Sequence, residues 1–234
     1  MPANDPRLTR LTERIWYLPF EEERDRPNLC YIKGDHWSLA VDAGHSVLHL
    51  RAFYSALEAN GLPLPALTVI THWHWDHSFA LADIHGLSLA NDRTNAYLRA
   101  AADTLAQQGP EAFCALSPAV RAEYAPGQPM RVVPADMAFT GEINLDAGGC
   151  PIRVFQAPAP HTDDSTLIFA PTEGVLFLGD APCREFATGR RDPALCRALS
   201  HAIRDTGASL CLEGHWTPQT AEEAAAELVG PEQP

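Results

Sequence analysis

The segment Leu67-Thr-Val-Ile-Thr-His-Trp-His-Trp-Asp-His77 joins a β-branched run to three histidines and an aspartate. The run is short enough for a buried strand, so the polar residues follow the strand's carboxyl end. Residues two apart in an extended chain point the same way, so His72 and His74 can bind one metal ion. Asp76 and His77 come after a turn and can face a second ion. Metal binding explains why so many polar groups gather here, because a core would leave them without partners.

Two neighbouring ions need more ligands than this segment holds, and three further residues of the right type follow predicted strands. They are His161 after the strand at 152–156, Asp180 after the strand at 175–178, and His215 after the strand at 209–212. Since each comes after a β segment, we expect all of them at one edge of a layered structure. The sequence therefore predicts a two-metal site.

Strand and helix patterns follow one another along the rest of the chain. Short β patterns bounded by Pro, Gly or Asp occupy 15–18, 28–33, 37–41, 131–133, 137–139, 142–145 and 166–169. Helical patterns occupy 45–60, 192–206 and 220–229, and an Ala-rich segment predicts two or three short helices from 91 to about 124. This order favours an α/β fold of the α+β type, with largely antiparallel sheets, over a doubly wound parallel sheet. We expect one domain over 1–234, with a helical insert at about 91–124.

The composition argues against several classes of partner. The net charge of −13, with no block of Lys and Arg, disfavours nucleic acid and anionic membranes. The N-terminus lacks a signal-peptide pattern and no stretch has the length of a membrane span, so we expect a cytoplasmic protein. The six cysteines are scattered without a C-x-x-C pair, which indicates neither a disulfide framework nor a thiolate zinc site.

The ordered motifs resemble those of the metallo-β-lactamase superfamily. The resemblance lies in H-x-H-x-D-H at 72–77, Pro-His-Thr-Asp-Asp-Ser at 160–165, Phe-Leu-Gly-Asp at 177–180, Glu-Gly-His-Trp at 213–216 and the early turn Val-Asp-Ala-Gly at 41–44. It extends over about 13–230. It implies a four-layer αββα sandwich with the metals at one end of the two apposed sheets.

The resemblance also implies a role for each candidate residue. It assigns His72, His74 and His161 to a first metal site, Asp76, His77 and His215 to a second, Asp180 to a bridging position and Asp42 to a supporting one. Imidazole and carboxylate ligands suit zinc, and they also suit iron or manganese. We expect two zinc ions per chain.

Two such ions would activate a shared water as the nucleophile, with Asp76 as the candidate for transferring the proton to the leaving group. The expected substrate is a small ester, thioester, lactone or amide. One alternative is an iron-dependent persulfide dioxygenase, although the complete second site argues against it. Another is a β-lactamase, although the most similar of those enzymes have Cys where Asp180 stands here. A nuclease and a metal-stabilised binding module are further alternatives.

Substrate specificity and the remaining residues are less well defined by the sequence. Specificity is expected in the charged loop at 21–26, in the helical insert and in the segment 182–191. Two alternatives are open for the arginines of the segment 182–191: they bind a substrate carboxylate, or they are solvated surface charges. These residues are Arg184, Arg190 and Arg191. We expect Trp73 and Trp75 to pack, and Trp216 either to pack or to line the pocket. The other histidines, His36, His45, His49, His85 and His201, are expected at the surface or in capping positions. The sequence does not indicate an oligomeric state.

Overall fold

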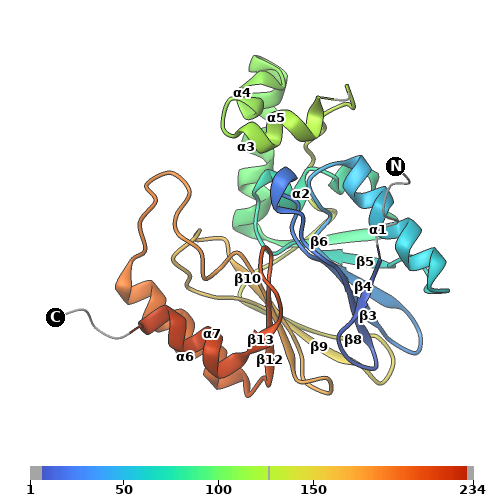
Figure 1. Ribbon diagram of the computed structural model, residues 1–234, viewed down its shortest axis with the longest axis vertical. Coiled ribbons are helices and arrows are strands. Elements are labelled where there is room, and N and C mark those ends of the chain that lie inside the picture. The colour runs from blue at the N-terminus through green and yellow to red at the C-terminus, as the bar shows by residue number, and fades with distance from the viewer. Residues whose placement is uncertain (1–6, 126, 231–234) are drawn as a thin grey trace.

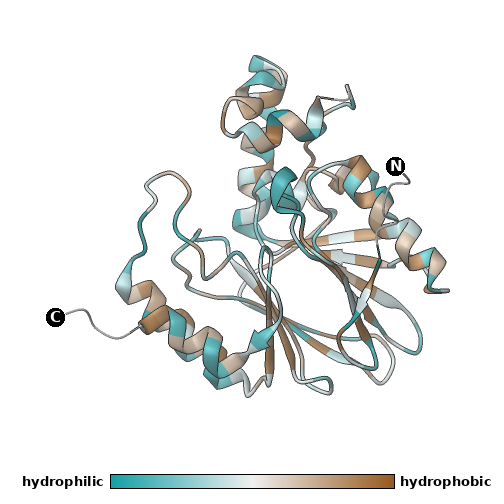
Figure 2. Ribbon diagram, in the orientation of Figure 1, coloured by the Kyte–Doolittle hydropathy of each residue, from teal (hydrophilic) through white to brown (hydrophobic). Residues whose placement is uncertain are grey.

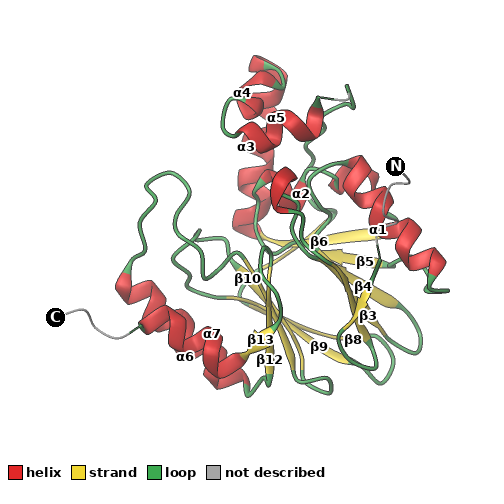
Figure 3. Ribbon diagram, in the orientation of Figure 1, coloured by secondary structure: helices red, strands yellow, loops and turns green. Residues whose placement is uncertain are grey.

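The computed structural model describes residues 7–125 and 127–230. It contains two β-sheets stacked face to face, with helices on both outer faces (Figures 1 and 3). The helix α1 lies outside the first sheet, and α6 and α7 lie outside the second (Figure 1). This confirms the four-layer αββα architecture expected from the sequence.

The first sheet has seven strands in sequence order, antiparallel from β1 to β4 and parallel from β4 to β7. They are β1 (Thr9–Arg10), β2 (Ile15–Leu18), β3 (Leu29–Lys33), β4 (Ser38–Val41), β5 (Leu67–Val69), β6 (Leu87–Asn91) and β7 (Met137–Phe139). The second sheet has the order β13-β12-β11-β10-β9-β8, in which β11 and β12 are the parallel pair. Its strands are β8 (Glu142–Asp146), β9 (Pro151–Gln156), β10 (Thr166–Ala170), β11 (Val175–Gly179), β12 (Leu210–Glu213) and β13 (Gln219–Thr220).

Five of the helices described begin at residues whose side chains cap them. Ser46, Asn91, Ser117, Asp192 and Thr220 each accept backbone N–H groups at a helix start. The helices are α1 (Val47–Ala59), α2 (Trp75–Ser78), α3 (Asp92–Gln108), α4 (Glu111–Cys114), α5 (Pro118–Tyr124), α6 (Pro193–Thr206) and α7 (Ala221–Val229). We call α3 to α5 the insert. Its breaks fall at Gly109-Pro110 and Ser117 and divide it into three helices, which agrees with the two or three helices predicted for this segment.

Apolar side chains fill three layers of contact. The layer between the sheets holds residues such as Ile32, Leu39, Val154 and Phe177. Alternate residues of the same strands face outward and pack under the helices, as Leu176 does beneath α6 and α7. Figure 2 shows hydrophobic residues concentrated in the strands and in stripes along the helices. Within the described residues, no helix is both long and apolar enough to cross a membrane.

The short strands β1 and β13 were not predicted from the sequence, and two longer segments also differ from the prediction. The segment 131–133, predicted as a strand, is irregular, and prolines 129 and 134 bracket it without N–H groups for a ladder. Conversely, β6 was not predicted, because Ser88 and Asn91 interrupt its apolar pattern. Both side chains are buried, and hydrogen bonds satisfy their polar groups. Ser88 Oγ donates to Asp136 over 2.7 Å, and Asn91 Nδ2 donates to Thr166 Oγ1 over 2.8 Å.

Candidate metal centre

The loops at one end of the sandwich carry all seven candidate ligands. His72 and His74 follow β5, Asp76 and His77 lie in the single turn of α2, and the others follow β9, β11 and β12. Six of the seven are buried, and His215 is partly buried. The structure thus brings together the residues that the sequence selected, in two adjacent groups.

The first group consists of His72, His74 and His161. The Nε2 atom of His72 lies 3.1 Å from Nδ1 of His74, and Nε2 of His161 lies 3.0 Å from the same Nδ1. Three imidazole nitrogens that converge in this way are close to the spacing of ligands held at about 2.0–2.1 Å around one tetrahedral ion. The group therefore has the donors and the shape of a metal site.

The second group consists of Asp76, His77, Asp180 and His215. Oδ2 of Asp76 lies 2.9 Å from Nε2 of His215 and 3.1 Å from Nε2 of His77. Oδ1 of Asp180 lies 3.3 Å from His77 Nε2, while its Oδ2 lies 3.7 Å from His215 Nε2 and 3.9 Å from His161 Nε2. Asp180 thus faces both groups, as a bridging ligand must.

Two buried polar atoms of the second group have no hydrogen-bond partner among the described residues, which indicates whether a cation fits there. Nε2 of His77 and Oδ1 of Asp180 are buried, yet neither makes a hydrogen bond within the described structure. Buried polar atoms without partners are costly, and a bound cation would satisfy both of them. Gly214 keeps the space beside Asp180 open, because the Cβ of any other residue there would lie only 2.3 Å from Asp180 Oδ1. The residues present therefore fit divalent ions.

Hydrogen bonds behind the two groups fix the imidazole rings. Nδ1 of His77 donates to Asp42 over 2.7 Å, which leaves its Nε2 facing the second group. The Asp42 carboxylate also accepts the Thr71 amide over 2.7 Å, and so matches the expected supporting position. Nδ1 of His161 donates to the carbonyl of Arg184 over 2.7 Å. Such outer contacts set the tautomer and orientation of a ligand.

The two groups differ in charge. Burial, reinforced by neighbouring imidazoles, lowers the pKa of His72 well below its usual value and that of His74 to about 4, so both rings are neutral at pH 7. Burial also acts to lower the pKa of His215, but Asp180 and Asp76 outweigh it and raise that pKa to about 9. Burial disfavours the charged form of Asp180, but the neighbouring imidazoles hold its pKa well below the usual range. The second group thus holds the ionised carboxylate of Asp180 beside the cationic imidazole of His215, whereas His72 and His74 of the first group are neutral.

Aromatic side chains border the first group. Trp75 is buried in the apolar cluster beneath the insert, and Trp73 packs at its edge, as the sequence predicted. The half-exposed ring of Phe186 has its centroid 4.9 Å from that of Trp75 and 5.9 Å from that of His74. Trp216 is 60% exposed, so it does not pack in the core. In the 182–191 segment, the three arginines are exposed: Arg184, Arg190 and Arg191.

Two histidines were placed wrongly by the sequence. His45 and His49 are buried rather than at the surface, and the residue that caps α1 is Ser46. His49 Nδ1 accepts the His45 amide over 3.3 Å. The signal was available, because His49 shares a helix face with Phe53 and Leu57, at intervals of four residues. His36, His85 and His201 are exposed, as expected.

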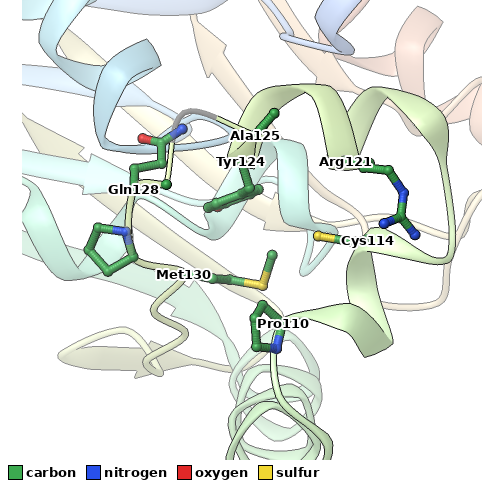
Figure 4. Close-up of a pocket in the computed structure, with 9 residues that line it drawn as sticks. Pro110, Cys114, Arg121, Tyr124, Ala125, Gln128 and Met130 are labelled. Atoms are coloured by element: carbon green, nitrogen blue, oxygen red, sulfur yellow. The ribbon is translucent and has the colours of Figure 1, made fainter.

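A hollow of about 390 Å³ lies between the insert and the segment that follows it (Figure 4). Its lining includes Cys114, Arg121, Tyr124, Gln128 and Met130, and none of the seven candidate ligands. Tyr124 also contacts the segment before α1, since its Oη donates to the His45 carbonyl over 2.7 Å, while Gln128 Nε2 donates to the Glu123 carbonyl of α5 over 2.7 Å.

Comparisons with known proteins agree with this geometry. No family model matches the chain. A curated relative, acyl-coenzyme A thioesterase MBLAC2 of Gallus gallus, is 28% identical over 173 residues, which cover 69% of this chain and 59% of that protein. The chain thus spans less than two thirds of the relative's length.

The solved structures that resemble the chain share its fold at low sequence identity. A metallo-β-lactamase from Pontibacter korlensis superposes with a TM-score of 0.67 at 14% identity, covering 95% of this chain and 96% of that one. The metallo-β-lactamase DIM-1 gives 0.64 at 19% identity, with 95% of each chain covered. The enzyme from Hirschia baltica gives 0.64 at 15% identity, with 97% and 98% covered. The chain therefore has the fold of these metallo-β-lactamases.

Proposed function

We propose that the protein is a hydrolase that uses two divalent metal ions, with zinc as the expected metal, on a small ester, thioester, lactone or amide. The observation that supports this most directly is the convergence of seven His and Asp side chains in two groups, with Asp180 facing both. Among these substrates we favour a thioester, because the curated relative is named an acyl-coenzyme A thioesterase.

The chemistry divides between the ions and the chain. When bound, such ions lower the pKa of a water molecule towards neutrality and polarise a carbonyl group. The imidazole rings of His72, His74 and His161 would supply nitrogen donors for one ion. Asp180 and Asp76 supply negative charge for the other. Asp76 is our candidate for moving the proton to the leaving group, because it supplies a carboxylate at the second group.

Two alternatives predict different results. A persulfide dioxygenase would use one iron ion held by two histidines and an aspartate, and the fully assembled second group argues against it. A β-lactamase would use the same two ions on a cyclic amide. The three solved metallo-β-lactamases described above are too dissimilar in sequence to carry their activity over to this chain.

Elemental analysis by plasma mass spectrometry, paired with a hydrolysis screen, tests the proposal. The screen contains a chromogenic cephalosporin, a lactone, a glutathione thioester and an acyl-coenzyme A. We expect about two zinc ions per chain and turnover of a thioester. Turnover of the cephalosporin alone would identify a β-lactamase. One iron per chain with no hydrolysis of any substrate would contradict the proposal.

The remaining expectations follow from the sequence and stay predictions. We propose a single catalytic domain that acts on a small-molecule substrate, without nucleic-acid or membrane partners. We also propose a cytoplasmic location. Fractionation of the native source, followed by detection of the protein with an antibody, tests this location.

A further inference from the structure

A buried carboxylate connects the insert to a loop beside the metal centre. Glu123, in α5, has a fully buried side chain. The Arg26 guanidinium donates to both of its oxygens, over 2.9 and 3.0 Å, and Arg24 lies 3.7 Å away. The Ser46 hydroxyl at the start of α1 also donates to it. Because a buried carboxylate without partners is strongly destabilising, these contacts fix three segments relative to one another.

The loop at 21–26 is held at its base by this contact. Its ends pair through two backbone hydrogen bonds between Glu21 and Arg26, of 2.8 and 3.1 Å. The next residue of α5, Tyr124, donates its hydroxyl to the His45 carbonyl. The ring Nδ1 of His45 in turn lies 3.1 Å from a carbonyl oxygen of the loop. Glu123 thus contacts the loop directly, and Tyr124 contacts it through His45.

The tip of the loop lies beside the second metal group. Asp25 adopts a left-handed conformation, with φ 53° and ψ 41°, and Trp75 Nε1 donates to its Oδ2 over 3.4 Å. Trp75 immediately precedes Asp76, one of the candidate ligands. Burial raises the pKa of the Asp25 carboxyl group. The Asp76 carboxylate raises this pKa further and His215 lowers it, so Asp25 is close enough to both candidate ligands to interact with their charges. The loop therefore forms part of the border of the metal centre.

We infer that Glu123 is a positioning residue that pins the 21–26 loop against the metal centre, so that the loop forms one wall of the substrate site. The inference deepens the proposed function and rests on it. Glu123 contacts none of the seven candidate ligands, so its loss acts through the loop. Releasing the loop weakens substrate binding without removing any ligand of the metal.

The test compares Glu123→Gln with Arg26→Lys, which keeps the cation but loses the two-pronged contact. The matched control is Glu111→Gln, because Glu111 pairs with Arg121 on the exposed side of the same insert. The readouts on the metal-loaded protein are metal content, hydrogen exchange of the amides at 20–28, and kcat and KM for the substrate that the wild type hydrolyses.

For Glu123→Gln we expect exchange of the loop amides to accelerate by about tenfold or more, and KM to rise by about tenfold. We expect kcat to stay within about twofold and the metal content to stay the same. Arg26→Lys should show smaller changes in the same direction, and Glu111→Gln none. If Glu123→Gln does not yield folded protein, Arg26→Lys decides the question.

Unchanged loop exchange and unchanged KM would overturn the inference. So would an equal acceleration of exchange throughout the chain, since that indicates a purely structural role. If the wild type hydrolyses none of the substrates, the proposed function fails. Loop exchange then decides whether Glu123 pins the loop, and the assignment of a substrate wall is withdrawn.

Discussion

Asp180 is the residue on which the two-metal arrangement depends most. Its Oδ1 lies near His77 and its Oδ2 lies near both His215 and His161, so replacing Asp180 with Ala removes negative charge from both groups. We predict that Asp180→Ala lowers the metal content from two ions per chain towards one. We also predict a loss of activity of more than about 100-fold, beyond the usual effect of an outer contact.

The control for this variant must be exposed and remote. A buried histidine such as His49 is unsuitable, because its side chain is hydrogen-bonded and its replacement would perturb folding. His201→Ala, on the exposed side of α6, is therefore the control. Equal metal loss in Asp180→Ala and His201→Ala would contradict the ligand assignment.

His49 gives a prediction about pH. Burial lowers the pKa of His49 well below its usual value of 6.5, so the folded state keeps the ring neutral while the unfolded state is protonated below pH 6.5. The unfolded state then binds more protons, and the free energy of unfolding falls as the pH decreases from 6.5. His49 contributes a slope that approaches about 1.4 kcal/mol per pH unit.

His49→Asn removes this contribution while keeping a hydrogen-bond acceptor. We predict that urea denaturation between pH 5 and 7 gives a shallower pH dependence for His49→Asn than for the wild type, by up to one proton. The other buried histidines are common to both proteins and cancel in the comparison. Identical slopes would show that His49 does not titrate in this way.

At the scale of the elements, α7 is held by its first turn. Thr220 accepts the Glu223 amide, and the Glu223 carboxylate accepts the Thr220 amide over 3.0 Å, which forms a capping box. We predict that Thr220→Ala lowers the free energy of unfolding by about 1 kcal/mol. The urea midpoint measures this loss. Because none of the candidate ligands lies in α7, kcat and KM should remain at their wild-type values.

Most elements could be predicted from the sequence because local rules agreed with the tertiary structure. The caps at Asn91 and Asp192 and the break at Gly109-Pro110 mark helix ends that the structure keeps. The strand β6 could not be found in this way, since its polar residues are satisfied by partners about 48 and 75 positions away. The Glu123 contacts were missed for the same reason, because a buried ion pair between distant segments leaves no local pattern.

At the scale of the whole molecule, the candidate ligands tie the two sheets together. A ligand that binds only the folded state stabilises it by about 2.7 kcal/mol at a concentration 100 times its Kd. For a chain of this size, that corresponds to roughly 5–10 °C in Tm. We predict a decrease of at least this size when a chelator is added to the metal-loaded protein, measured by calorimetry. Asp180→Ala should lose less on chelation, and an unchanged Tm in the wild type would argue against bound metal.

Each sheet is built from one continuous half of the chain, which has a consequence for dissection of the protein. Residues up to Phe139 form the first sheet, residues from Glu142 form the second, and the exposed Thr140-Gly141 connects them. The first half carries His72, His74, Asp76 and His77, and the second carries His161, Asp180 and His215. Two fragments cut at this connection should reassociate into one molecule, and neither alone should retain the metal. Metal bound by the mixed fragments, but by neither fragment alone, would then show that the two halves had reassembled without a covalent link.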